Sequence, residues 1–198
     1  MVDNIYFVTT NPTKILHARV ALAEFGIKVT AQKVDLIEPR AENPEDVAEE
    51  KAIQALAKIN RPLIVEDSGI FIQALNGFPK TFVRFVTDTI GVEKIIKMMA
   101  DESNRNVEFH QSLAYIEPGM KTPQIFSYID GGFTLADRVW DSVSEPGSGG
   151  FDAILIPPGE TKPLCMFSKE WRAKRDMNTN RGNIHYHQLA RWLSDKYK

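Results

Sequence analysis

The chain has 198 residues, of which 43% are hydrophobic, so it is long enough for one well-filled core and short for two independent ones. Its formal net charge of -2 excludes the global basic excess of proteins that hold nucleic acid mainly by neutralising phosphates. We therefore expect no nucleic-acid partner, and any site for an anion must be local.

Cysteine content and apolar runs indicate a location. Cys165 is the only cysteine, so no internal disulfide can form, and its apolar neighbours favour a buried packing role. The first residues have neither a charged nor an apolar signal-peptide region, and no apolar run approaches the roughly 20 residues that span a bilayer. We expect a cytoplasmic protein with no membrane partner.

The first segment predicts a strand, a loop and a helix. Asn4 to Thr9 is apolar and rich in strand-forming residues, and apolar residues at helical spacing follow as far as Phe25. Pro12 suits the first helical turn, with Thr10 or Asn11 as the N-cap. The loop is thus expected to aim free backbone amides at whatever lies in front of it.

The strand and helix alternation continues. Ile27 to Lys33 predicts a strand, Glu45 to Ile59 a helix, and Pro62 to Val65 a short buried strand that ends at Glu66-Asp67-Ser68-Gly69. Alternation of this kind is typical of α/β folds.

The rest of the chain predicts helices, then long antiparallel strands, then a loop, a strand and a final helix. In order, these are helices in Phe82 to Ala100 split near Gly91, strands Val107 to Ile116 and Pro123 to Ala136, a loop Ser142 to Gly150, a strand Phe151 to Ile156 and a helix Asn183 to Tyr197.

The first loop is a candidate phosphate site. Thr9-x-Asn11-x-x-Lys14 places small polar side chains and the positive end of a helix beside a lysine. It is not a P-loop, because it lacks the glycines and the Gly-Lys-Ser/Thr ending. On this pattern alone, an ordinary helix cap followed by a solvated lysine is the favoured alternative.

Two acidic segments are candidate metal sites. Asp67 follows a buried strand, where α/β folds place ligands, although Asp67 and Ser68 shaping a turn is an equal alternative. Glu38, in Asp35-Leu36-Ile37-Glu38, is weaker alone, but a magnesium-triphosphate site needs one or two such carboxylates.

Two later segments are further candidates for ligand binding. Gly149-Gly150-Phe151-Asp152 permits close approach of the backbone to a ligand, or is a flexible turn that enters a core strand through Phe151. The basic segment from Lys174 to Gly182 is predicted as a loop that binds phosphate or has no ligand.

Taken in order, these segments resemble the inosine triphosphate pyrophosphatase family, which hydrolyses deaminated purine triphosphates such as ITP, dITP and XTP. The family motifs T-x-N-x-x-K, D-L-x-E and D-S-G correspond to Thr9 to Lys14, Asp35 to Glu38 and Asp67 to Gly69. The motifs L-x-G-x-P with a downstream basic residue and G-[YW]-D correspond to Leu75 to Pro79 with Arg84 and to Gly150 to Asp152. Asn180-Arg181-Gly182 lies where the family has S-H-R. The resemblance covers the chain from end to end.

The resemblance implies a mixed α/β fold in two lobes, with an elongated central mixed sheet, a long antiparallel platform, flanking helices and a substrate cleft between the lobes. Residues 1–198 would form one domain, with one lobe from 1–80 plus 150–198 and a platform lobe from 81–149. It also implies a homodimer that cleaves a nucleoside triphosphate to the monophosphate and pyrophosphate.

The resemblance also implies roles for single residues. Glu38 and Asp67 would hold Mg²⁺, for which Mn²⁺ is a possible substitute, and Asp67 would activate the attacking water. The substrate would be bound by Thr9, Asn11, Lys14, Lys51, Ser68, Arg84, Gly150, Phe151, Asp152, Lys174, Asn180 and Arg181.

The departures from the family pattern lie at the base end of the site. Gly149 replaces an aromatic residue and Asn180 replaces the histidine of S-H-R, so an altered or broadened base preference is predicted. Three residues compete for one remaining phosphate role: Arg172, Lys174 and Arg175, of which we favour Lys174.

Two alternatives stay open at this stage. One is a non-catalytic nucleotide sensor on the same fold, which retention of both Glu38 and Asp67 disfavours. The other is a nucleic-acid-binding module that stacks bases on Trp171, which the acidic charge balance disfavours.

Overall fold

A computed structural model describes residues 3–141, 150–178 and 184–197. Gly149, Asn180 and Arg181 therefore lie outside the described residues. The chain divides into two compact units, of which the first draws on Met1–Ser68, Gln111–Tyr128 and Thr179–Lys198, and the second on Gly69–His110 and Ile129–Asn178.

These boundaries differ from the predicted lobes, 1–80 plus 150–198 and 81–149, because three long strands contribute residues to both units. They are β3 (Leu63–Ile72), β5 (Asn106–Ile116) and β6 (Gln124–Leu135). A division based on runs of the sequence misses boundaries that fall inside strands.

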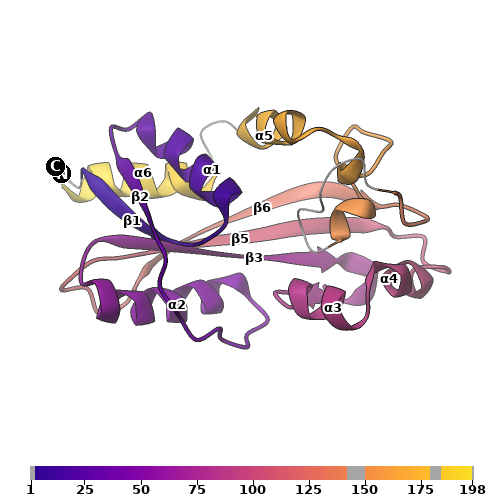
Figure 1. Cartoon of the computed structure of the whole chain (residues 1–198), viewed down its shortest axis with the longest axis horizontal. Coiled ribbons are helices and arrows are strands. Elements are labelled where there is room, and N and C mark those ends of the chain that lie inside the picture. The colour runs from indigo at the N-terminus through magenta and orange to yellow at the C-terminus, as the bar shows by residue number, and fades with distance from the viewer. Residues whose placement is uncertain (1–2, 142–149, 179–183, 198) are drawn as a thin grey trace. The chain divides into compact units, whose positions relative to one another are not determined.

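The strands form a mixed seven-stranded sheet, which confirms the predicted fold class (Figure 1). Its order is β2-β1-β3-β5-β6-β7, with β4 paired to β3. The remaining strands are β1 (Asn4–Val8), β2 (Lys28–Gln32), β4 (Pro79–Lys80) and β7 (Leu155–Ile156). β1 pairs in parallel with both β2 and β3, and helices connect these parallel strands.

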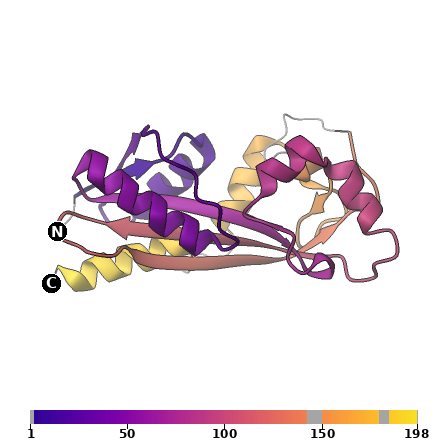
Figure 2. The ribbon, with the colours of Figure 1, turned by 90° about the horizontal axis from the view of Figure 1, so that it is seen from below.

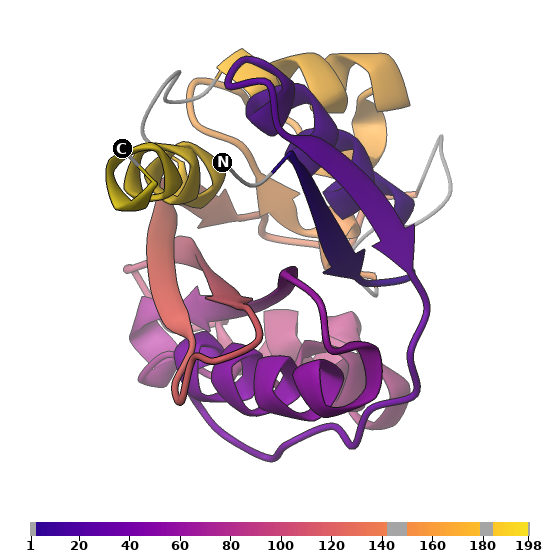
Figure 3. The same ribbon diagram turned by 90° about the vertical axis from the view of Figure 1, so that its left-hand side faces the viewer.

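The helices of the first unit cover both faces of its part of the sheet. They are α1 (Pro12–Ala23), α2 (Pro44–Ile59) and α6 (His185–Lys196). Figure 3 shows α2 on one side of the strands and α1 and α6 on the other, and in Figure 2 α2 lies lengthwise along the sheet.

The side chains of β3 alternate between these two layers. Ile64 belongs to the apolar cluster of α1 and α6, whereas Leu63 and Val65 pack with alanines of α2. Successive side chains of a strand point to opposite faces, so this alternation also governs the polar residues that follow.

The second unit holds the shorter elements, around a core that includes Ile95, Phe133 and Phe151. Its helices are α3 (Val83–Thr89), α4 (Val92–Met98) and α5 (Lys169–Asn178). Its short 3₁₀ segments are Gln73–Leu75, Phe151–Ala153 and Leu164–Met166. The predicted split near Gly91 is confirmed. Gly91 has a φ of 80° between α3 and α4, a conformation that favours glycine.

Three local predictions were wrong. The segment from Glu66 to Gly69 lies inside β3 and is not a turn, so the strand does not end at the acidic residues. Only Leu155–Ile156 of the predicted strand Phe151 to Ile156 is extended, because the preceding residues form a 3₁₀ turn. The basic segment from Lys174 is helical as far as Asn178, because α5 runs from Lys169.

Gly69 is required by a neighbouring strand and not by a turn. A Cβ atom at Gly69 would lie 2.6 Å from the carbonyl oxygen of Lys80, which belongs to β4. Strand β4 pairs antiparallel with β3 at this place. Glycine therefore permits the close approach of two backbones.

Cys165 is buried, as predicted, and burial raises the pKa of its thiol.

Within the described ranges, no helix is both long and apolar enough to cross a membrane.

Candidate active site

The loop between β1 and α1 is held by its own side chains. Asn11 is the N-cap, and its Oδ1 accepts hydrogen bonds from the backbone N–H groups of Thr13, at 2.9 Å, and Lys14, at 3.3 Å. Thr9 Oγ1 accepts from the N–H of Asn11 at 3.1 Å. Asn11 as N-cap and Pro12 in the first turn confirm the sequence prediction.

The same bonds correct one expectation about this loop. The amides of Asn11, Thr13 and Lys14 already have partners, and Pro12 has no N–H group to offer. The positive charge that the loop presents to an anion is therefore carried mainly by the Lys14 side chain and by the helix dipole.

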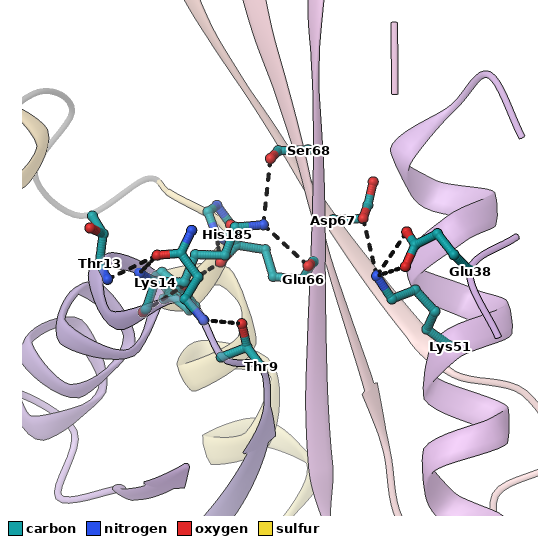
Figure 4. Close-up of polar contacts among 11 residues, drawn as sticks. Thr9, Thr13, Lys14, Glu38, Lys51, Glu66, Asp67, Ser68 and His185 are labelled. Carbon is teal, nitrogen blue, oxygen red and sulfur yellow. Dashed lines mark hydrogen bonds and ion pairs between the residues drawn. The ribbon is translucent and has the colours of Figure 1, made fainter. Parts of the chain in front are cut away.

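Lys14 reaches from α1 to the middle of β3. Its Nζ atom lies 3.2 Å from the backbone oxygen of Glu66, 3.3 Å from Glu66 Oε1 and 3.4 Å from Ser68 Oγ (Figure 4). An ammonium group has three N–H donors, and three oxygen atoms surround this one. The ammonium is thus fixed in direction before any ligand is bound.

Glu66 is almost fully buried, accepts a hydrogen bond from one further residue and lies close to another. Tyr186 donates its hydroxyl to Glu66 Oε2, and His185 Nε2 lies 3.4 Å from the same oxygen. Burial alone would raise the pKa of Glu66, but the charge of Lys14 and the contacts with His185 and Tyr186 outweigh it and hold that pKa well below its usual range. Glu66 is therefore ionised at neutral pH.

Asp67 points to the opposite side of β3, toward α2. Lys51 Nζ, from α2, lies 3.5 Å from Asp67 Oδ1 and 3.0 Å from Glu38 Oε2 (Figure 4). Burial raises the pKa of Asp67, Lys14 and Lys51 oppose this rise, and Glu38 adds to it. A raised pKa makes Asp67 a stronger base than an exposed aspartate.

Glu38 belongs to a loop that is attached to α2. Gln54 bonds the backbone of Ile37 twice, with its Oε1 2.8 Å from the amide nitrogen and its Nε2 3.1 Å from the carbonyl oxygen. Lys58 donates to the backbone oxygen of Asp35. These bonds hold Glu38 on the same side of β3 as Asp67.

Glu38 and Asp67 suit a divalent cation. Both carboxylates contact one ammonium group, that of Lys51, so both already converge on a positive charge. Within the described part of the chain no group of three acids, histidines or cysteines completes a cage. Mg²⁺ commonly takes one or two carboxylates and fills its remaining positions with water and phosphate oxygens. The donor set fits that ion.

The extended conformation of β3 explains how both lysines reach one short segment. Glu66 and Ser68 face α1 and its Lys14, whereas Asp67 faces α2 and its Lys51. A turn at Asp67 and Ser68, the alternative that the sequence left open, would not separate the two lysines in this way. The first unit alone thus brings together the predicted residues Thr9, Asn11, Lys14, Glu38, Lys51, Asp67 and Ser68.

The predicted residues of the second unit have local partners. Arg84 is 95% exposed in its side chain and lies 3.7 Å from Asp88. Phe151 is fully buried in the core, and Gly150 before it has a φ of 87°. Asp152 Oδ2 lies 2.5 Å from Arg172 Nη1.

The three competing cations differ in exposure. Arg172 pairs with Asp152, and Arg175 lies 3.1 Å from Asp130 and 4.6 Å from the ring centroid of Phe133. Lys174, by contrast, is exposed. Its phosphate role stays a prediction.

The grouping of Glu66 with His185 and Tyr186 was not predicted from the sequence. Glu66 lies next to Asp67, but its hydroxyl partner Tyr186 follows 120 residues later, at the start of α6. The only sequence signal is a polar His185-Tyr186-His187 run where a helix begins, and all three side chains are buried.

Comparison with known proteins gives a consistent result. The model of the Ham1 family matches residues 5–179. A protein of Methanopyrus kandleri named dITP/XTP pyrophosphatase is 36% identical over 170 residues, which cover 86% of this chain and 87% of that protein. A protein of Thermococcus kodakarensis with the same name is 32% identical over 195 residues, which cover 97% of this chain and 98% of that protein.

Solved structures agree in fold. A HAM1 protein from Coxiella burnetii has a TM-score of 0.76 at 23% identity, with 98% of this chain and all of that chain covered. The Ham1 protein of Staphylococcus aureus has a TM-score of 0.73, also at 23% identity, with 98% of this chain and 99% of that chain covered. The mixed sheet and its flanking helices are thus shared with both.

Proposed function

This chain belongs to the Ham1 family, and we propose that it hydrolyses nucleoside triphosphates of deaminated purines, dITP and XTP among them, to the monophosphate and pyrophosphate. The archaeal relatives that bear the name dITP/XTP pyrophosphatase support the substrate class. The observation that carries the proposal is the arrangement on β3, where Lys14 lies on one side and Asp67, Glu38 and Lys51 on the other.

Lys14, Asp67 and Glu38 have different roles in the proposed hydrolysis. Lys14 binds phosphate oxygens and lowers the effective charge of the triphosphate. Asp67 orients a water molecule for attack on the α-phosphorus and accepts its proton, the bond between the α- and β-phosphates breaks, and pyrophosphate leaves. Glu38 and Asp67 would hold Mg²⁺, which when bound would neutralise charge on the phosphates.

Lys51 has a distinct part in this proposal. Its ammonium balances Glu38 and Asp67, which lie on the same side of β3 and repel each other. When a cation and a triphosphate bind, the same lysine would lie beside the phosphate oxygens. Lys51 therefore serves both the free and the occupied site.

The test is a turnover assay with purified protein and MgCl₂. We expect pyrophosphate and the monophosphate from dITP and XTP, and little product from ATP or GTP. Measuring pyrophosphate and inorganic phosphate separately identifies the cleaved bond. The proposal is wrong if no triphosphate in a panel of standard, deaminated and modified bases releases pyrophosphate, and a non-catalytic sensor would then be the better reading.

Four finer points belong to the same proposal. A base preference altered by Gly149 and Asn180 would show in the panel as a changed ratio of dITP to XTP turnover. Mn²⁺ would replace Mg²⁺ with altered rate, the chain would form a homodimer, and the enzyme would act in the cytoplasm. The panel, a metal series and light scattering test the first three.

A further inference from the structure

We propose that Glu66, Tyr186 and His185 form a buried group that positions Lys14 for the triphosphate; this inference rests on the proposed function. We name these three residues the Glu66 group. None of them is expected to touch the substrate, so Glu66 is a positioning residue and acts through Lys14.

The two oxygens of the Glu66 carboxylate have different partners. Oε1 lies 3.3 Å from Lys14 Nζ, while Oε2 accepts from the hydroxyl of Tyr186 and lies 3.4 Å from His185 Nε2. The hydroxyl of Tyr186 thus fixes the orientation of the carboxylate, His185 packs beside the same oxygen, and the carboxylate in turn fixes the ammonium. Three elements, α6, β3 and α1, meet at this one side chain.

Burial separates the Glu66 group from Lys14. The side chains of Glu66 and His185 are 4% and 3% exposed, whereas that of Lys14 is 21% exposed. A buried carboxylate must be paired, because an isolated charge in the interior is costly. Lys14 is therefore the member through which the group reaches solvent and an incoming anion.

The contacts of Lys14 also indicate which one a phosphate replaces. Ser68 Oγ is the most distant of its three oxygens, at 3.4 Å, and is neutral. Exchange of this hydroxyl for a phosphate oxygen leaves both Glu66 contacts in place. The ammonium then binds without a search through rotamers, which lowers the entropic cost of binding.

The first experiment compares Glu66→Gln with wild type in the turnover assay. The amide keeps the shape of the side chain but loses its charge, so we expect KM for dITP to rise about tenfold with kcat changed less than about threefold. The same substitution in a Lys14→Met background should change KM by less than about twofold, because the lysine through which Glu66 acts is absent.

A general loss of structure would give a different pattern. Equal losses from Glu66→Gln in both backgrounds, or an unchanged or lower KM in wild type, would overturn the proposal. Tyr186→Phe is the second variant, since it removes one hydroxyl and keeps the ring; we expect a smaller rise in KM, again only when Lys14 is present. If Glu66→Gln does not fold, Tyr186→Phe decides the matter by the same coupling.

The chain offers a matched control. Glu117 accepts from Tyr115 Oη at 2.7 Å, Tyr197 Oη at 2.6 Å and Lys196 Nζ at 2.6 Å, so it is another carboxylate held by tyrosine and lysine. Glu117→Gln and Tyr115→Phe remove the same chemical groups as the test variants. We expect both to reduce thermal stability and to leave KM for dITP unchanged.

A binding experiment separates this inference from the proposed function. Calorimetry with inorganic tripolyphosphate in EDTA measures the lysine contribution without turnover or metal. Glu66→Gln should weaken binding about tenfold, and no further weakening should follow in Lys14→Met. If wild type binds tripolyphosphate with this coupling but hydrolyses nothing, the proposed function fails and the positioning role stands. Binding that is insensitive to Glu66 removes the positioning role.

Discussion

Asp67 combines three properties at the scale of single residues. Its carboxylate lies against a lysine, it is 15% exposed, and burial raises its pKa. A carboxylate with a raised pKa is a stronger base than an exposed aspartate. Its neighbour Glu66, one position earlier, is driven in the opposite direction by Lys14, His185 and Tyr186.

The substitution Asp67→Asn tests the catalytic role. The amide cannot accept a proton from water, so we expect kcat to fall at least about 100-fold, with tripolyphosphate affinity in EDTA changed less than about threefold. The exposed Asp101→Asn is the control and should behave as wild type. Near-normal turnover by Asp67→Asn would remove Asp67 from this role.

The pH profile gives an independent check on Asp67. The carboxylate must be ionised to act, and its pKa is raised, so kcat/KM should fall as pH decreases through a value above the 3.8 of an unperturbed aspartate. A profile from pH 4 to 8 should show an acidic limb that the protein's thermal stability does not follow. A flat profile down to pH 4 contradicts this assignment.

At the scale of elements, β3 is the one whose nature matters most to the site. Its apolar run is interrupted by Glu66, Asp67 and Ser68, which is why the strand was predicted to end there. The strand continues because Ile70 and Phe71 pair with β4, and the three polar residues find partners on the two adjacent helices. Those partners are remote in sequence and cannot be inferred from a local window.

The close strand pairing at Gly69 predicts that alanine destabilises the protein more at Gly69 than at Gly131. Gly69→Ala would force a Cβ to within 2.6 Å of the Lys80 carbonyl, so we expect a loss of stability of about 1–3 kcal/mol. Gly131 of β6 is the matched control, because its nearest atom would lie 3.9 Å away. Thermal melts of both alanine variants measure the difference, and equal melting temperatures would contradict the close approach.

The end of α6 is attached to the turn between β5 and β6 through Glu117. Lys196, Tyr197 and Tyr115 outweigh the effect of burial and lower the pKa of Glu117. A carboxylate with a lowered folded-state pKa contributes stability above the unfolded value near 4.5 and loses it as pH falls through the folded value.

Glu117→Gln should therefore have a free energy of unfolding about 1–2 kcal/mol lower than that of wild type at pH 7. It should also unfold at a lower temperature. The gap between the two melting temperatures should narrow as pH falls below about 4.5. Melting curves at pH 7, 5, 4 and 3 test this. A gap that stays constant over this range shows that the charge of Glu117 is not the cause.

At the scale of the whole molecule, the sequence predicted what depends on local pattern. The N-cap at Asn11, the alternation of strands and helices from β1 to β3 and the break at Gly91 follow from residue preferences within a few positions. The Glu66 group and the boundaries between the two units do not, because they depend on which faces of a long strand meet which helices. Motifs located Asp67 and Lys14; tertiary packing alone revealed that they lie on opposite sides of β3.

The charge distribution of the whole chain decides between a nucleotide and a nucleic acid as ligand. With a formal charge of -2, the chain has no general attraction for a polyanionic strand, and in the described residues Lys14 and Lys51 are both paired with carboxylates of the site. A compact triphosphate with its own Mg²⁺ adds a cation to this site, whereas a strand does not.

We therefore expect magnesium and tripolyphosphate at 100 times the dissociation constant to stabilise the protein by about 2.7 kcal/mol, seen as a raised melting temperature. A single-stranded 20-mer should produce neither this stabilisation nor an electrophoretic shift at low salt, and a salt-dependent shift that competing tripolyphosphate leaves intact would favour a nucleic-acid-binding module.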